Sequence, residues 1–211
     1  MIRFILKTLI VISAWLPPAA LSEPFDVAPF STIRAVDGVD VVVRQGGEQS
    51  VVLAQGNAPS DAKVTVSNGV LTLGRARNGG ISTRLGHQAS LRFDVMAPSL
   101  EGLDSRAGAD VTIIGVDATS LTLEARSGAD IKVSGTCDTL IVTATAGGDI
   151  DAQDLSCREV TARSSGGGEV SLVATSSVDA VASSGSDIVV YGDPATRKTR
   201  DRTGGRVVIR D

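Results

Sequence analysis

The sequence is poor in aromatic side chains and contains a single histidine. Its 211 residues include four Phe, one Tyr and one Trp. This shortage weakens stacking of sugar rings on aromatic faces as a binding mode. The lone histidine, His87, is far in sequence from the two cysteines, Cys137 and Cys157. A metal centre or a catalytic cysteine is therefore not predicted, no cofactor is expected, and His87 is interpreted as a solvated loop residue.

Long apolar runs are also missing. The only candidate, residues 9–16, is too short to cross a bilayer as a helix. Arg3 and Lys7 precede it, and Ala20 and Ser22 place small residues where a signal peptidase cleaves. Residues 1–22 are therefore predicted to be a signal peptide, with an uncleaved membrane anchor as the alternative. We expect the mature protein to begin at Glu23 and to be periplasmic, or located at the cell surface.

Positive charge is scarce as well. Without Arg3 and Lys7, the 20 Lys and Arg fall to 18 against 24 Asp and Glu, a formal charge of −6. Nucleic-acid binding requires a basic surface, so it is not expected.

Glycine is abundant and recurs at a fixed period. A Gly followed by a small residue, an acid and a β-branched residue appears at steps of 20, 19, 20 and 18 residues, and a further step of 19 reaches Gly204. A constant period of this length indicates stacked repeats. The acid is replaced by Arg206 in the last copy. The recurring pairs are Gly108 and Asp110, Gly128 and Asp130, Gly147 and Asp149, Gly167 and Glu169, and Gly185 and Asp187.

Each period contains two short stretches in which apolar and polar residues alternate. In residues 111–125, Val111 and Ile113 alternate with threonine, and Leu121 and Leu123 repeat the pattern after a polar segment. Alternation with a period of two predicts strands with one buried face. The glycine supplies the positive φ of a tight corner between strands. Stacked units of this kind predict an all-β, two-sheet parallel β-helix (β-solenoid) over residues 101–211.

Residues 23–100 show β-type patterns without the regular period, and they are predicted to form an irregular β start to the same domain, 23–211. Candidate strands cover residues 31–36, 39–45, 50–54, 63–67, 70–74 and 90–96. Asn68-Gly69 and Asp37-Gly38 each separate two alternating runs, which favours β-hairpins at both places. Residues 75–89 are rich in Gly and Arg and are predicted to be a long exposed loop.

The order of these features resembles a known family. Phe30 and Ile33, residues 39–46, the run 68–73 and the segment 95–100 before the Gly corners together resemble the head GIN domain of auto-transporter adhesins. The resemblance implies a parallel β-helix with tight Gly turns, a bacterial periplasmic or surface location, and a role in adhesion. It supplies no catalytic residues. The chain differs from the family pattern because its corners read Ala-Gly-Ala-Asp or Ser-Gly-Ala-Asp where Gly-Ser-Gly is usual.

The recurring acids allow two interpretations. Stacked on consecutive rungs, like charges would lie about 5 Å apart and repel one another. The row could hold Ca²⁺, as the Gly-Asp repeats of β-roll proteins do. Alternatively, each carboxylate accepts backbone N–H bonds at its corner, with Arg106 and Arg126 nearby. The structural interpretation is preferred and no metal is predicted, because only one acid recurs per turn.

Cys137 and Cys157 each lie three residues before the apolar start of the next strand, at Leu140 and Val160. They therefore occupy equivalent places on adjacent rungs, within the Cα–Cα range of a disulfide. We expect a rung-to-rung disulfide in an oxidising compartment.

Two surface features near the C-terminus suggest contacts with partners. The basic residues Arg197, Lys198, Arg200 and Arg202 either contact an anionic polymer or form a solvated end of the solenoid. Val189 and Val208 are expected on the outward face of the last two rungs, where they could support self-association.

The function that these patterns favour is a non-catalytic adhesion-like or interaction module of the cell envelope, with an unidentified polymer or protein as partner. A polysaccharide-active β-helix enzyme is an alternative, for which Asp151, Arg163 and Lys132 are outward-facing candidates. No specific catalytic set marks these residues. A purely structural envelope protein is a third possibility.

Overall fold

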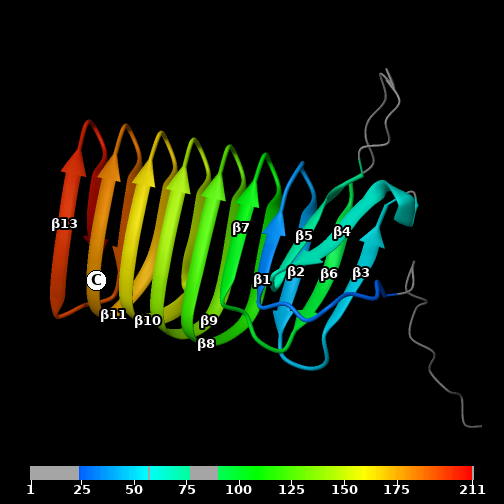
Figure 1. Ribbon diagram of the computed structural model, residues 1–211. Coiled ribbons are helices and arrows are strands. Elements are labelled where there is room, and N and C mark those ends of the chain that lie inside the picture. The colour runs from blue at the N-terminus through cyan, green and yellow to red at the C-terminus, as the bar shows by residue number, and fades with distance from the viewer. Residues whose placement is uncertain (1–23, 57, 77–89, 211) are drawn as a thin grey trace, which may run out of the picture.

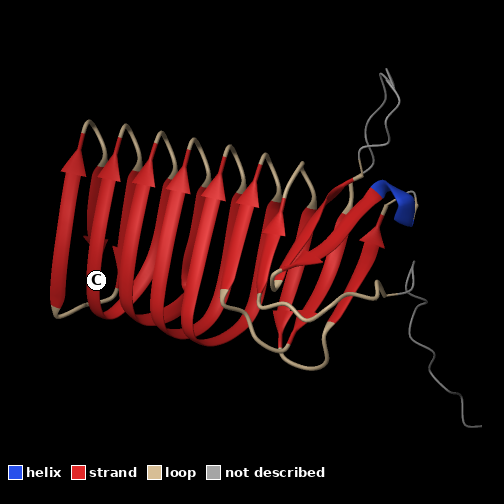
Figure 2. Cartoon of the chain, in the orientation of Figure 1, coloured by secondary structure: helices blue, strands red, loops and turns tan. Residues whose placement is uncertain are grey.

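The structure is a computed structural model, and it describes residues 24–56, 58–76 and 90–210. Most of these residues lie in strands, with one 3-10 turn, η1 (Figure 2). No helix in these ranges is long and apolar enough to span a membrane. The elements are β1 (Thr32–Ala35), β2 (Asp40–Gln45), β3 (Ser50–Gln55), η1 (Pro59–Asp61), β4 (Ala62–Ser67), β5 (Val70–Arg75), β6 (Arg92–Ala97), β7 (Gly102–Arg106), β8 (Asp110–Arg126), β9 (Asp130–Thr145), β10 (Asp149–Ser165), β11 (Glu169–Ser183), β12 (Asp187–Tyr191), β13 (Thr196–Arg202) and β14 (Arg206–Arg210).

The chain forms the predicted parallel β-solenoid, with two sheets facing each other across an apolar core (Figure 1). The long strands β8 to β11 bend and contribute to both sheets. We call the layer β4-β5-β1-β7-β8-β9-β10-β11-β13 sheet 1, and the layer β3-β6-β2-β8-β9-β10-β11-β12-β14 sheet 2. Sheet 1 uses the second half of each long strand and sheet 2 the first half. The sheets therefore alternate along the chain, as the repeat predicts.

Tight corners connect sheet 1 to sheet 2 and line up along one edge of the solenoid (Figure 1). At the first regular corner, Ala107 has φ 55° and Gly108 has φ 71°. Two consecutive positive φ values define a turn in which the second residue favours glycine. The same pairing of a positive-φ residue with a positive-φ glycine recurs at 127–128, 146–147, 166–167, 184–185 and 203–204.

The core becomes smaller toward the C-terminus. Leu123, Val142, Ala162 and Ala180 are paired in register from β8 to β11, and all four are fully buried. The next position in this row is Thr199, on β13, whose residues are all exposed. Because the apolar volume shrinks rung by rung, the solenoid closes with a polar strand and does not expose a wide apolar end.

The N-terminal region contains two rungs in an order that differs from the chain order. β1 pairs in parallel with β5 on one side and with β7 on the other, while β2 lies between β6 and β8. The β1–β2 rung is therefore inserted between the β5–β6 rung and the β7–β8 rung. Two antiparallel strands, β4 against β5 and β3 against β6, cover the N-terminal edges of the two sheets.

One of the two predicted hairpins is confirmed and the other is wrong. Asn68-Gly69 joins the antiparallel pair β4 and β5. Asp37-Gly38 joins β1 to β2, which lie in different sheets and do not pair. The Gly38 N–H donates to the carbonyl of Ala107 in the next corner. Asp37-Gly38 is therefore a further corner of the solenoid. The predicted signal peptide, and the predicted loop beyond Ala76, fall outside the described residues.

Candidate functional site

An acidic row runs along the outer face of sheet 2, where each rung leaves its corner. Backbone pairing places Asp40 beside Asp110, Asp110 beside Asp130, Asp130 beside Asp149, and Glu169 beside Asp187. The row carries one more carboxylate than the sequence interpretation proposed, because Asp40 begins it. The row ends at Arg92 on one side and at Arg206 on the other. Arg92 is the backbone partner of Asp40 in strand register, and Arg206 is that of Asp187. We call Asp40, Asp110, Asp130, Asp149, Glu169 and Asp187 the acidic row.

The carboxylates of the acidic row are balanced in part by local partners. Asp149 accepts the backbone N–H of Glu169 at 2.8 Å, and Asp187 accepts the Nε–H of Arg206 at 3.3 Å. Partial burial, followed by repulsion from Asp130 and Asp40, raises the pKa of Asp110 above its ordinary value of 3.8. Arg106 and Arg126, expected near this row, instead bond Asp104 and Glu124 on sheet 1.

Replacing Asp110 with asparagine is expected to stabilise the protein at neutral pH by less than about 1 kcal/mol, because the side chain is largely exposed. A raised pKa means that the folded state binds the proton more tightly than the unfolded chain does. The charged Asp110 carboxylate therefore lowers the stability of the folded protein only where it is ionised. This destabilisation is absent well below pH 3.8, grows as the pH rises through the unfolded-state and then the folded-state pKa, and is complete at neutral pH. Urea unfolding of both proteins at several pH values would measure this.

The matched control for that measurement is Glu48→Gln, an exposed carboxylate outside the row. An Asp110→Asn advantage that persisted unchanged at pH 3 would contradict the electrostatic explanation.

Metal binding gains no geometric support from the acidic row. Each rung contributes one carboxylate, and no group of three or more His, Cys, Asp or Glu suited to a metal ion occurs in the described part of the chain. Ca²⁺ commonly takes six or more oxygen ligands. The Ca²⁺ alternative therefore stays a hypothesis for calorimetric titration.

The basic residues form the last strand of sheet 1. Arg197, Lys198, Arg200 and Arg202 all lie on β13, which is exposed along its whole length. Arg197 pairs with Asp193, and Arg200 lies 3.4 Å from Asp179. Within the described residues, Lys198 and Arg202 form no ion pair. These two charges are therefore available for contact with an anionic partner.

The two valines expected on the outside lie beside each other. Val189 on β12 pairs with Val208 on β14, and both are half-buried. Self-association through this pair stays a prediction.

The two cysteines form a disulfide. Cys137 on β9 and Cys157 on β10 are paired in register, with their Cα atoms 4.6 Å apart. The bond links two adjacent rungs near the curved edge opposite the corners, and both side chains are buried. It confirms the pairing that the sequence predicts.

Two of the three residues considered for an enzyme are brought together, and the third lies on the other sheet. Lys132 and Asp151 form an ion pair of 3.2 Å on sheet 2, and the hydrogen bond to Asp151 raises the pKa of Lys132. Arg163 lies in the sheet 1 half of β10, between Thr143 and Val181. His87 falls outside the described residues. Lys132, Asp151 and Arg163 therefore do not form one common site.

A polar cluster on the outer face of sheet 1 was missed from sequence. The Asp104 carboxylate is nearly buried and accepts hydrogen bonds from Arg34 Nε at 3.0 Å and Arg106 Nε at 2.6 Å. Arg34 lies on β1, and Asp104 and Arg106 lie on the neighbouring strand β7. Arg34 and Asp104 are 70 residues apart in the sequence. The alternating pattern places Arg34 and Asp104 on the outward faces of β1 and β7. That they are neighbours could be recognised only once the order of the rungs was known.

Together, the stacked rungs, aligned corners and rung-to-rung disulfide define a parallel β-solenoid with two exposed sheet faces. The chain belongs to the family described as putative auto-transporter adhesin, head GIN domain, whose model matches residues 29–194.

Solved structures share this fold. A putative adhesin from Bacteroides fragilis NCTC 9343 aligns with a TM-score of 0.69 at 19% identity, covering 89% of this chain and 95% of that one. A putative adhesin from Parabacteroides distasonis ATCC 8503 aligns with a TM-score of 0.54 at 15% identity, covering 89% and 95%. At these identities the likeness shows the fold alone. The comparison with curated proteins gave no match.

Proposed function

We propose that the protein is a non-catalytic, exported interaction module of the bacterial cell envelope, with an adhesion-like role. The observation that carries this proposal is the ordered outer surface. From β8 to β11 the outward side chains are held on strands paired on both sides, so rows of charged and hydroxyl groups stand at fixed spacing. A surface that is ordered before binding loses little conformational entropy when it meets an extended polymer.

Export is supported by the N-terminal signal pattern and by the disulfide. Disulfides persist in oxidising compartments and are rare in the cytosol. Membership of an adhesin family agrees with a surface or periplasmic location. The basic strand β13 supplies one contact for an anionic envelope polymer, since Lys198 and Arg202 are exposed on an otherwise acidic protein.

The proposal is tested by binding of the purified chain 23–211 to whole bacteria and to lipopolysaccharide vesicles. Lys198→Gln/Arg202→Gln is expected to weaken vesicle binding about fivefold at low salt, and less at high salt because exposed charges are screened. The control is Arg44→Gln/Lys63→Gln, which removes the same charge from exposed positions on β2 and β4.

Absence of binding to any cell or envelope polymer would contradict an adhesion-like role. Turnover of a polysaccharide that a single carboxylate substitution abolishes would replace the proposal with the enzyme alternative. Equal loss of vesicle binding in the control would show that net charge, and not β13, is responsible.

A further inference from the structure

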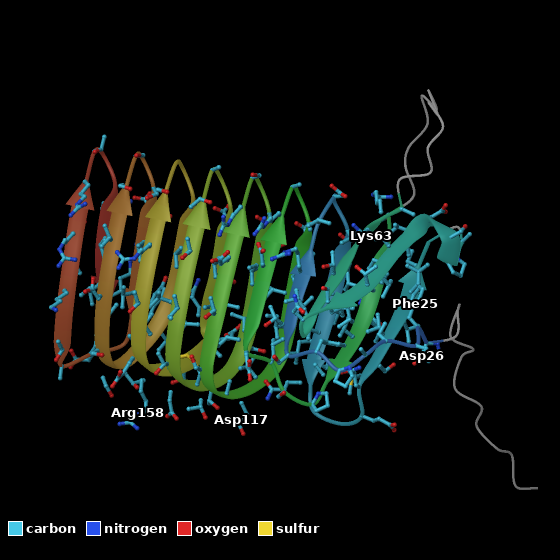
Figure 3. All side chains as sticks on the ribbon, in the orientation of Figure 1. Phe25, Asp26, Lys63, Asp117 and Arg158 are labelled. Atoms are coloured by element: carbon cyan, nitrogen blue, oxygen red, sulfur yellow. A yellow bond between two sulfur atoms is a disulfide. The ribbon has the colours of Figure 1, made fainter. Side chains whose placement is uncertain are left out.

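The outer face of sheet 1 is hollowed beside the crossover that leads from β6 to β7. After β6, residues 98–101 pass beyond the inserted β1–β2 rung to reach β7. A groove of about 810 Å³ lies between this crossover and the curved segment at 117–120. Figure 3 shows Asp117 on the curved edge, opposite the corners. The volume is typical of a small-ligand site.

The floor of the groove is formed at Gly102, which has no side chain. Thr32, Gly102 and Thr122 lie side by side on β1, β7 and β8, and the middle position carries no side chain, which lets the Thr32 side chain come close to Gly102. A Cβ at Gly102 would lie 3.3 Å from Thr32 Cγ2 and 3.7 Å from the Thr122 carbonyl oxygen. Gly102 does not have a positive φ, so its backbone does not require glycine. Glycine at position 102 is therefore not required by the backbone conformation. Its effect is on the outer surface, where a larger side chain would occupy the groove.

The polar groups in the groove are held in place before any ligand binds. Asp104 fixes the guanidinium groups of Arg34 and Arg106, and its hydrogen bond raises the pKa of Arg106. Glu124 is bonded by Arg126. Such ion pairs orient donors and acceptors at little further cost in side-chain entropy.

Two hydrogen bonds between Gln45 and Asp117 stabilise the rim of the groove. Gln45 Nε2 donates to the carbonyl of Asp117 at 2.8 Å, and the Asp117 N–H donates to Gln45 Oε1 at 3.3 Å. This contact joins β2 to the curved segment of β8 and holds the hydroxyl residues Thr119 and Ser120 at the groove.

The chemistry of the lining selects among ligand classes. Two guanidinium groups face four carboxylates, Glu101, Asp104, Asp117 and Glu124, so an anionic ligand is disfavoured. β1, β7 and the sheet 1 half of β8 are each paired on both sides, so a peptide cannot add as a strand here. Leu100 and Leu103 are buried and offer little apolar surface. Recognition must therefore rest on side-chain hydrogen bonds.

We propose that this groove binds a short neutral oligosaccharide, whose hydroxyl groups match the hydroxyl, carboxylate and guanidinium groups of the lining. The proposal rests on the proposed function and names the ligand class of one of its contact surfaces. Binding is by hydrogen bonding across a preformed groove without aromatic stacking, so individual affinities are modest and repeated units of a polymer strengthen attachment.

Isothermal titration with short fragments of glucan, mannan, galactan and xylan tests the assignment. At least one fragment is expected to bind the wild-type chain, and Gly102→Val, which fills the floor, is expected to weaken it at least about tenfold. Ser120→Ala/Thr122→Ala removes two hydroxyl groups without adding volume, and it provides the same test if Gly102→Val does not fold. The control is Thr161→Val, in the same outward row on β10 but away from the groove.

Binding by the wild type that both groove variants retain would overturn the groove assignment. Failure of every neutral fragment, while whole bacteria or vesicles still bind, would overturn the ligand class and leave the proposed function intact. Groove-dependent binding of oligolysine in place of sugars would reassign the groove to a cationic peptide. Failure of all surface binding would instead contradict the proposed function itself.

Discussion

Replacing Gly148 with alanine is expected to destabilise the solenoid by about 3 kcal/mol, as overpacking against atoms that cannot move does. A Cβ at this position would lie 2.5 Å from the carbonyl carbon and oxygen of Ala125 and 2.7 Å from the Arg126 nitrogen. These are backbone atoms of the preceding rung. Real Cβ atoms do not approach backbone so closely, so one rung would have to shift away from the next.

The neighbouring residue provides a matched control. Gly147 has φ +73°, and a Cβ there would meet nothing within 4 Å. Gly147→Ala is therefore expected to cost only the left-handed backbone penalty, about 1 kcal/mol. Urea unfolding of both variants, followed by circular dichroism, measures the difference. Equal urea midpoints for the two variants would contradict the prediction. They would mean that the corner at Gly148 relaxes to the geometry found at Ala129, the equivalent residue one rung earlier.

The comparison of the two glycines shows what the sequence can reveal about the corners. The period and the need for positive φ are visible in the spacing of Gly108, Gly128 and Gly147. The close approach at Gly148 is not visible, because it depends on the distance between rungs. Likewise, the residue before each corner glycine, such as Ala107 or Ala146, also has positive φ. Such residues pay a local cost that the stacking of rungs offsets.

The wrong hairpin has a specific physical cause. Asn68 and Gly69 have φ 50° and 73°, and Asp37 and Gly38 have φ 62° and 64°. The local conformation is the same in both turns, and the sequence predicts it correctly. Whether the flanking strands pair with each other or enter different sheets is decided by distant partners, β5 and β7 for β1, and β6 and β8 for β2.

One part of the candidate site was within reach of the sequence and another was not. Gly38-Val39-Asp40 has the same spacing as Gly108-Ala109-Asp110, so the sixth carboxylate of the acidic row could have been recognised. The groove could not, because it arises from the crossover that carries residues 98–101 past the inserted rung. That crossover depends on non-local parallel pairing, which no local pattern specifies.

Removing the disulfide is expected to lower the free energy of unfolding by about 3 kcal/mol, because it closes a loop of 20 residues in the unfolded chain. In a solenoid each rung contacts only its neighbours, so the loss falls on the interface between β9 and β10. Cys137→Ala/Cys157→Ala avoids placing hydroxyl groups at two buried positions. The change is read from urea unfolding of the oxidised wild type and the variant.

A reducing agent separates the covalent bond from the packing of the sulfur atoms. It should destabilise the wild type by nearly the whole difference and leave the variant unchanged, and hydrogen exchange should rise first in β9 and β10. Titration of the untreated denatured protein should find no free thiol. Two free thiols, or a wild type indifferent to reduction, would show that the two rungs are held together by strand pairing and core packing alone, and would remove one of the supports for export.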